Sequence, residues 1–306
     1  MLLFLKKLGL FFLLAFAVWF ALYGSSKTID RAYLSKEYSN LSTLVLGDSH
    51  TKYINELVLP NAENLSYEGE TFKEAYYKLK YFSQFNKLND VVLGVSYHNF
   101  TYLTEYKIRT DYHSINRIAS ISSIQELFKS TDSFADFIDV ATRLHMPQTA
   151  DNWFYTDNSR ASLIDRNITY RDVERMKKNP KRKVNCKKVV DRRIQKHYYY
   201  HNNAEYRSKS AEEYLSAIIS HCQTHNINLI FVNMPLHPCY RSKIPEYYIN
   251  NLNAVINQYR QNDHVSYLDY TDQFDMLKTY FRDADHCTEY GSHVITEQLL
   301  EEIKRG

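Results

Sequence analysis

The feature that most constrains the fold is a series of short apolar runs, each bounded by polar residues. Residues 91–95, for example, are polar-free, as expected of a strand covered on both faces of a parallel sheet. Between the runs, apolar residues recur at the spacing of amphipathic helices. Strands that alternate with helices predict an α/β fold with a three-layer α/β/α, doubly wound parallel sheet. The expected strands are residues 44–46, 62–67, 90–95, 229–232 and 265–268.

Two helices can be placed from their first residues. Thr71 is followed three positions later by Glu74, and Ser210 is followed in the same way by Glu213. Both are capping-box patterns, in which the two side chains bond to free N–H groups at a helix start. We therefore expect helices to begin at residues 71 and 210.

The first apolar run leads into a candidate nucleophile. The run ends at Gly47, and Ser49 follows after one residue. Apolar positions in residues 53–57 keep helical spacing, so Ser49 is expected on a sharp turn from a strand into a helix. That turn lies at the carboxyl end of a parallel strand, where open α/β sheets bind ligands. A helix N-terminus there would also favour developing negative charge. An ordinary turn is the alternative.

A base and an orienting acid occur near the C-terminus. Asp283 and His286 are three residues apart, so in a turn they lie on one side. Asp283 could then hold one imidazole nitrogen while the other faces Ser49, which is the logic of a serine–histidine–aspartate triad. Asp285 is adjacent, but it would point elsewhere if Asp283 and His286 share a face. We expect Ser49, Asp283 and His286 to meet at one edge of the sheet.

These residues make the chain resemble the SGNH (GDSL-like) hydrolase superfamily. Gly-Asp-Ser-His at residues 47–50 resembles its first block, Asp283-x-x-His286 its last, and Gly69 the glycine of its second. The third block, usually Gly-x-Asn-Asp, departs from the pattern because the asparagine is missing after Gly94. The resemblance covers roughly residues 41–99 and 228–300. It implies a flavodoxin-like fold, an acyl-serine at Ser49, and an oxyanion site formed by N–H groups of Ser49 and Gly69.

Three more side chains are candidate oxyanion or substrate contacts. Asn99 follows the strand at residues 90–95, and Asn233 follows the strand at 229–232 at the same sheet edge. Trp153 belongs to an aromatic cluster that suits binding of a sugar chain. Each has a simpler alternative, a loop residue for the two asparagines and a packing residue for Trp153.

Residues 100–210 match no part of the family and are expected to be an insertion in one domain, residues 41–306. The segment is too long for a structureless loop and leaves from the active edge of the sheet. We expect it to form a lid or substrate groove without taking part in bond breaking. It carries a basic stretch, for which a solvated loop, an acidic glycan and lipid headgroups remain alternatives. The basic residues are Lys177, Lys178, Lys181, Arg182, Lys183, Lys187, Lys188, Arg192 and Arg193.

The N-terminal residues have the character of a membrane anchor. A helix from Leu2 to Tyr23 would be roughly 33 Å long, enough for a bilayer core of about 30 Å. Lys6 and Lys7 predict a cytoplasmic N-terminus by the positive-inside rule. We expect an uncleaved transmembrane anchor at residues 1–24 and a linker at 25–40, so that the domain is periplasmic or extracellular. A cleaved signal peptide is the alternative, although bulky residues occupy the cleavage region.

Composition and cysteine spacing narrow the remaining possibilities. The net charge of +3 is too small to argue for nucleic acid. The chain has no glycine-rich phosphate loop and no dinucleotide fingerprint, so no cofactor is expected. Its four cysteines match no zinc spacing, so no metal is expected either. An even number of cysteines permits disulfides in an exported chain, but their pairing stays open. They are Cys186, Cys222, Cys239 and Cys287.

Together these features predict a membrane-anchored serine esterase or O-acyltransferase. Its substrate would be an ester-linked acyl group, acetyl foremost, of an extracytoplasmic glycan. The resemblance also implies a cell-envelope polysaccharide system. A multispan acyltransferase in the membrane is a candidate partner, and its presence would favour transfer. The alternative is a non-catalytic glycan-binding or assembly subunit of such a system. The acyl group, the acceptor, and the choice between hydrolysis and transfer remain open.

Overall fold

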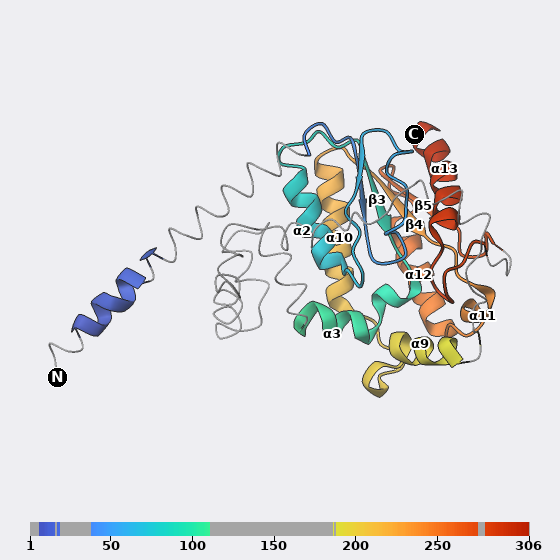
Figure 1. Cartoon of the computed structure of the whole chain (residues 1–306), viewed down its shortest axis with the longest axis horizontal. Helices are drawn as coiled ribbons and strands as arrows, with labels where there is room; N and C mark the ends of the chain where they lie inside the picture. The colour runs from blue at the N-terminus through green and yellow to red at the C-terminus, as the bar shows by residue number, and fades with distance from the viewer. Residues whose placement is uncertain are drawn as a thin grey trace.

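The computed structural model describes residues 6–15, 17–18, 38–110, 186, 188–274 and 279–305. Its centre is a five-stranded sheet with the order β2-β1-β3-β4-β5. Figure 1 shows β3, β4 and β5 between α2 and α10 on one side and α13 on the other. Every neighbouring pair of strands is parallel, so the predicted parallel α/β sheet is confirmed. This strand order is the flavodoxin-like one. The strands are β1 (Thr43–Leu46), β2 (Ala62–Asn64), β3 (Asp90–Gly94), β4 (Asn228–Asn233) and β5 (Val265–Asp269).

Helices cover both faces of the sheet. Leu44 and Leu46 of β1 belong to one core cluster with residues of α2, α10 and α12. Val45, which points the other way, belongs to a second cluster with residues of α13. The described helices are α2 (Phe72–Phe82), α3 (Tyr102–Thr110), α9 (Lys188–Tyr198), α10 (Lys209–Thr224), α11 (Pro238–Arg241), α12 (Glu246–Tyr259) and α13 (Glu289–Arg305), with 3-10 turns η1 (Tyr97–Phe100) and η3 (Tyr200–Asn202).

The burial of β1 explains why its sequence does not alternate. Leu44, Val45 and Leu46 are all fully buried, because each face of the sheet has its own layer. Complete burial of such a side chain contributes about 1.5–3 kcal/mol. A strand with one solvated face would carry polar residues at alternate positions.

The two predicted helix starts have different outcomes. Thr71 caps α2, and its N–H donates to the Glu74 carboxylate at 2.9 Å, which completes the capping box. Helix α10 begins earlier than predicted, with Ser208 as its N-cap accepting from the Ala211 N–H. The Ser210 hydroxyl instead donates to Glu105 of α3 at 2.8 Å. A tertiary contact therefore takes the side chain that the local pattern assigned to the cap.

The helix predicted directly after Ser49 is wrong. Residues 49–53 form turns, in which the Ile54 N–H donates to the Thr51 carbonyl three positions before it. The side-chain amide of Asn64 donates to the carbonyls of Thr51, Lys52 and Ile54. These carbonyls would otherwise accept the i to i+4 bonds of a helix. A single side chain from β2 thus replaces the helical bonds.

Both described ends of the segment 100–210 are part of the domain. Val190, Ile194 and Tyr198 on one face of α9 are buried in the core cluster that also contains Ile108 of α3. The middle of the segment, including Trp153, lies outside the described residues.

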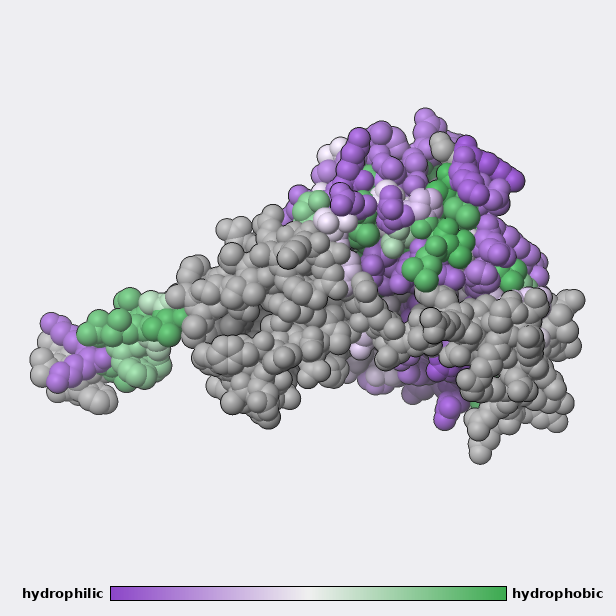
Figure 2. Space-filling model, turned by 45° about the horizontal axis from the view of Figure 1, so that its top comes forward, coloured by the Kyte–Doolittle hydropathy of each residue, from purple (hydrophilic) through white to green (hydrophobic). Residues whose placement is uncertain are grey.

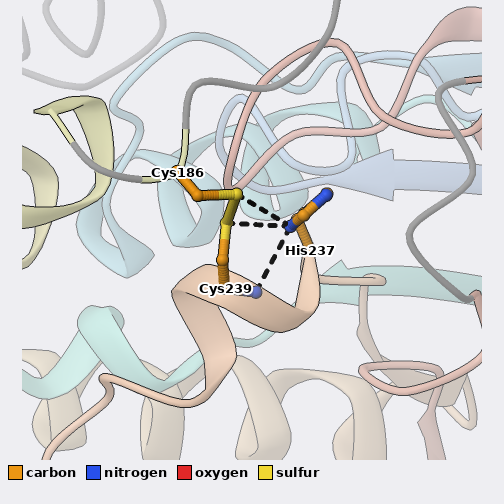
Figure 3. Close-up of side chains that lie close together, drawn as sticks. All are labelled: Cys186, His237 and Cys239. Carbon is orange, nitrogen blue, oxygen red and sulfur yellow. Dashed lines mark hydrogen bonds between the residues drawn. A yellow bond between two sulfur atoms is a disulfide. The ribbon is translucent and has the colours of Figure 1, made fainter.

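A disulfide joins this segment to the end of the sheet. Cys186, just before α9, pairs with Cys239 of α11. The His237 ring lies beside the bond, with Nδ1 2.9 Å from the Cys239 sulfur (Figure 3). Cys222 and Cys287 are free thiols and are buried. The disulfide therefore ties α9 to the loop that follows β4.

The N-terminal residues 6–15 and 17–18 are helical. Leu10, Phe11, Phe12 and Leu13 of this segment are more than half exposed, and Figure 2 shows the segment as mainly hydrophobic with a hydrophilic tip. Within the described residues, no helix has the length and apolar character needed to cross a bilayer. The anchor at residues 1–24 stays a prediction.

Candidate active site

Ser49, His286 and Asp283 are joined by hydrogen bonds at the carboxyl edge of the sheet. The Ser49 hydroxyl lies 2.7 Å from His286 Nε2. On the other side of the ring, His286 Nδ1 lies 2.9 Å from Asp283 Oδ1. With the ring proton on Nδ1, Nε2 is free to accept the serine proton. The structure brings these three side chains together, and their catalytic roles stay predictions.

Gly47 determines how the chain reaches Ser49. Its φ is +137°, a conformation that favours glycine. A Cβ at this position would lie 2.6 Å from the Thr51 hydroxyl oxygen and 3.1 Å from the backbone of Gly94. Strands β1 and β3 therefore approach each other closely just before Ser49. The crevice between them is the switch point where sheets of this order bind ligands.

The loop that carries Asp283 and His286 is held from α9. Arg193 donates from one nitrogen to Asp283 and from the other to Asp285, each at 2.8 Å. Asp283 Oδ1 also accepts the backbone N–H groups of Asp285 and His286. The predicted divergence of the two acids is only partial, because Asp285 Oδ1 lies 3.6 Å from His286 Nδ1.

The pKa values of the two acids of this loop shift in opposite directions. Burial opposes ionisation of Asp283, but the hydrogen bond and charge of His286, with Arg193, hold its pKa well below the usual range. Burial dominates at Asp285 and raises its pKa, although His286, His50 and Arg193 oppose the shift. Asp283 is therefore the carboxylate that faces the imidazole as an anion.

Two backbone N–H groups are available for an oxyanion. Neither the Ser49 N–H nor the Gly69 N–H has an acceptor among the described residues. Gly69 has a φ of +72°, and a Cβ there would lie 2.9 Å from the ammonium of Lys107. That ammonium donates to the Gly69 carbonyl at 3.3 Å. The absent side chain thus leaves room for Lys107 of α3 beside the proposed oxyanion site.

A second aspartate–histidine cluster lies next to the first. Asp48 accepts from His50 Nδ1 at 2.8 Å and from His98 Nε2 at 2.6 Å. The His50 ring lies between two others, with its centroid 4.7 Å from that of His286 and 4.8 Å from that of His98. The His98 ring is in turn 5.2 Å from that of His197 on α9. Four imidazoles therefore form a row that starts at the candidate base.

Burial and neighbouring charges shift the pKa values of these histidines in different directions. Burial alone would raise the pKa of Asp48, but His50 and His98 outweigh it and hold the value well below its usual range. Burial disfavours the charged form of His50, yet Asp48 and the two acids of the C-terminal loop raise its pKa. Burial lowers the pKa of His98 and of His197, with help from neighbouring positive charge. His50 is thus the most readily protonated of the three.

Among the described residues, three groups of side chains lie close enough to hold a metal ion. Cys186, His237 and Cys239 form one, but its sulfurs are joined in the disulfide. The other two are Asp48 with His50 and His98, and His50 with Asp285 and His286. Their nitrogens mostly bond to carboxylates, although His50 Nε2 and Asp285 Oδ1 are buried without a partner in the described structure.

The two clusters line one cavity of about 420 Å³. It lies at the carboxyl ends of β1 and β3 and is walled by the 3-10 turn η1, by α3 and α9, and by the loop before α13. Arg193, Lys196 and His197 share the cavity-facing side of α9, at the i, i+3 and i+4 spacing of one helix face. Both ends of the segment 100–210 therefore contribute wall to the candidate active site.

Of the other predicted substrate contacts, one lines the cavity, one does not, and one lies outside the described residues. Asn99 lines the cavity, but its amide donates to Asp48 at 3.4 Å and its oxygen accepts the Ser96 N–H. Asn233 is not among the lining residues; it is buried, and its amide donates to the Tyr267 hydroxyl. This placement does not favour a substrate contact, because β4 turns the side chain toward β5. Trp153 lies outside the described residues.

Sequence reasoning missed the most important support of the site. Arg193 was grouped with a basic stretch whose solvated form was one alternative, whereas it bonds to both acids of the C-terminal loop. The available signal was helical spacing. Val190 and Ile194 mark the buried face of α9, and Arg193 with Lys196 falls beside it.

The sequence of this chain has low similarity to those of the solved structures that it resembles. A protein-family model matches residues 155–305, less than half of the chain, and no curated protein matches it. A solved structure from Streptococcus pneumonia, provisionally named a platelet activating factor, is 11% identical, with 96% of this chain and 99% of that chain covered and a TM-score of 0.43. A provisionally named acylhydrolase from Bacteroides fragilis is 11% identical, with coverages of 90% and 94% and a TM-score of 0.40. Likenesses this weak carry no functional argument.

Proposed function

We propose that this protein is a serine ester hydrolase or O-acyltransferase. The observation that carries the proposal is the continuous hydrogen-bonded series from the Ser49 hydroxyl through His286 to Asp283, with 2.7 Å between serine and imidazole. A serine in a structural turn needs no such partner. A hydroxyl, a base and an orienting carboxylate in this order are the parts of nucleophilic acyl transfer.

The first half of the reaction makes an acyl-serine. His286 Nε2 takes the Ser49 proton as the oxygen attacks the ester carbonyl, and Asp283 stabilises the imidazolium that forms. The N–H groups of Ser49 and Gly69 stabilise the tetrahedral oxyanion. The bond between the acyl carbon and the alcohol oxygen then breaks, and the alcohol leaves with the proton from His286.

The second half returns the free serine. His286 takes a proton from the incoming hydroxyl, which attacks the acyl carbon. The bond between the acyl carbon and the Ser49 oxygen then breaks, and His286 returns the proton to that oxygen. Water as the incoming group gives hydrolysis, and a sugar hydroxyl gives transfer. We extend the proposal to an acyl group, acetyl foremost, on an extracytoplasmic glycan, for an enzyme anchored in the membrane through residues 2–23. A multispan acyltransferase is the partner that such a system would require for transfer.

The rival is a non-catalytic glycan-binding or assembly subunit with the same fold. Its support is the altered third block, since the Asn99 amide donates to Asp48 instead of supplying a third oxyanion donor. The serine–histidine–aspartate series speaks against it, because a binding module needs no activated hydroxyl.

A fluorophosphonate probe separates the two. We expect wild-type protein to gain one covalent adduct, located at Ser49 by peptide mass spectrometry, and Ser49→Ala to gain none. Ser242→Ala is the matched control, because Ser242 is an exposed serine outside the cavity and its loss should leave labelling intact. Wild-type protein that stays unlabelled and fails to hydrolyse para-nitrophenyl acetate would favour the binding subunit.

A further inference from the structure

The cavity mouth carries two exposed cations, Lys196 and Arg282, that have no acidic partner among the described residues. Four lysine and arginine residues line the cavity, and one of them, Arg193, is held by Asp283 and Asp285. The other three come from three different elements. They are Lys107 of α3, Lys196 of α9 and Arg282 of the loop before α13.

The remaining acids of the cavity wall are matched elsewhere. Glu70 forms an ion pair with Lys78, and both side chains are almost completely buried. Glu68 pairs with Lys52, which is not a lining residue. Asp48 accepts from two histidines. These carboxylates therefore have little charge to offer Lys196 or Arg282.

Lys196 and Arg282 are presented to the solvent side of the cavity. Both residues are exposed, and neither has an acidic partner within 4.0 Å in the described part of the chain. The Arg282 guanidinium lies 5.8 Å from the centre of the Tyr53 ring and bonds to its hydroxyl. Tyr53 thereby positions one edge of the guanidinium, and the other nitrogens remain free to bind an anion in a forked geometry.

Lys107 extends this charge inward. Its ammonium lies beside Gly69, where the ester carbonyl is proposed to bind. The two outer cations flank the residues of the triad, since Lys196 follows Arg193 by one helical turn and Arg282 precedes Asp283. A substrate that enters this mouth meets cations before it meets the serine.

We infer that the substrate carries an anionic oxyacid group, a carboxylate, phosphate or sulfate, next to the scissile ester, and that Lys196 and Arg282 bind it. The inference rests on the proposed ester chemistry and names the class of molecule on which it acts. Such cations also raise the local concentration of an anionic substrate and its rate of association at low salt.

The test compares two acetyl esters of nearly the same shape that differ in charge, para-acetoxybenzoate and the neutral para-acetoxybenzamide, with each kcat/KM divided by the rate of uncatalysed hydrolysis. We expect wild-type kcat/KM to favour the anion, with a preference that shrinks between about 0.05 M and 0.5 M salt because exposed charges are screened. Lys196→Gln and Arg282→Gln should each reduce the preference by about two- to fivefold, as for exposed ion pairs, and the double variant by about tenfold. Lys209→Gln, an exposed lysine outside the cavity, should leave the preference unchanged.

A preference for the neutral ester, or an anion preference that survives the double substitution, overturns the inference. If neither ester is hydrolysed, the proposed ester chemistry is refuted, and the anion-binding inference is tested by ligand affinity instead. For this arm, Ser49→Ala protein is titrated calorimetrically with para-acetamidobenzoate and the uncharged para-acetamidobenzamide. Tighter binding of the anion that is lost in the Lys196→Gln/Arg282→Gln background supports the inference, and equal binding of both compounds contradicts it.

Discussion

The pair Asp283–His286 and the pair Asp48–His50 each consist of one aspartate and one histidine, and both pairs line the same cavity. In both, the histidine Nδ1 lies within 2.9 Å of the carboxylate. They differ at Nε2, which faces the Ser49 hydroxyl in His286 but is buried without a partner in the described structure in His50. The comparison teaches that two similar aspartate–histidine pairs differ in what they can do, because only the pair whose far nitrogen meets a hydroxyl is placed to accept a proton from a nucleophile.

Solvent access separates the pairs as well. The Asp283 side chain is 26% exposed, whereas that of Asp48 is 9% exposed and is shared between two histidines. A buried carboxylate with two imidazole donors is costly to disrupt. A partly exposed carboxylate such as Asp283 can respond to the changing charge of His286 during proton transfer. We therefore expect the first pair to control activity and the second to control stability.

The largest expected effect is on activity at the two histidines. His286→Gln should lower kcat for an acetyl ester by about 10⁶-fold, as loss of the triad histidine does. His50→Gln should lower kcat by less than about tenfold, because no hydroxyl faces its Nε2. Steady-state kinetics on variants with wild-type circular dichroism measure both. Equal losses would mean that the row of imidazoles acts as one catalytic unit.

Next is stability at the two acids. Asp48→Ala should lower the free energy of unfolding by about 3 kcal/mol, because His50 and His98 lose their buried partner. Asp283→Ala should cost about 1 kcal/mol, since solvent can replace part of its contacts. Urea unfolding at neutral pH gives both values. A larger loss at Asp283 than at Asp48 would reverse the assignment of roles.

A smaller effect is expected at Arg193, which supports only the first pair. Arg193→Gln should lower kcat by about tenfold with little change in KM, because the acid loop loses its contacts at Asp283 and Asp285 while the serine stays in place. Arg193→Lys keeps the charge and should recover part of the loss. A change confined to KM would instead assign Arg193 to substrate binding.

The smallest effect concerns pH and His197, at the far end of the row. Burial, with the nearby charges of His98 and His50, holds the pKa of His197 well below that of the unfolded chain, which is about 6.5. The folded protein therefore resists protonation there, and this stability is complete above pH 6.5 and is lost as the pH falls below it. Between pH 7.5 and 5.5, His197→Gln should lose about 1 kcal/mol less than wild type in urea unfolding. Parallel pH profiles would show that His197 does not contribute.

The sequence by itself determined the elements whose signals are local. The apolar runs identified the central strands β1, β3 and β4 to within a few residues, because burial on both faces of a parallel sheet excludes polar residues whatever the neighbours are. The edge strands β2 and β5 were also located to within a few residues, although β2 contains polar residues and β5 is only partly buried. The capping box at Thr71 and Glu74 was equally reliable, since both partners lie within one helical turn. The contact between Asp283 and His286 was also predictable, because these two residues are only three positions apart.

Only the tertiary structure decided which distant group satisfies each polar atom. The Asn64 amide replaces a helix after Ser49 with turns, and Arg193 reaches the acid loop across 90 positions. Asn233 bonds to Tyr267 and not toward the cavity. Hydrogen bonds and charge pairs of this kind depend on which surfaces the fold brings together, and a local pattern contains no information about the partner. The sequence therefore predicted the serine, the histidine and the aspartate as candidates, while the tertiary structure determined which residues hold them in place.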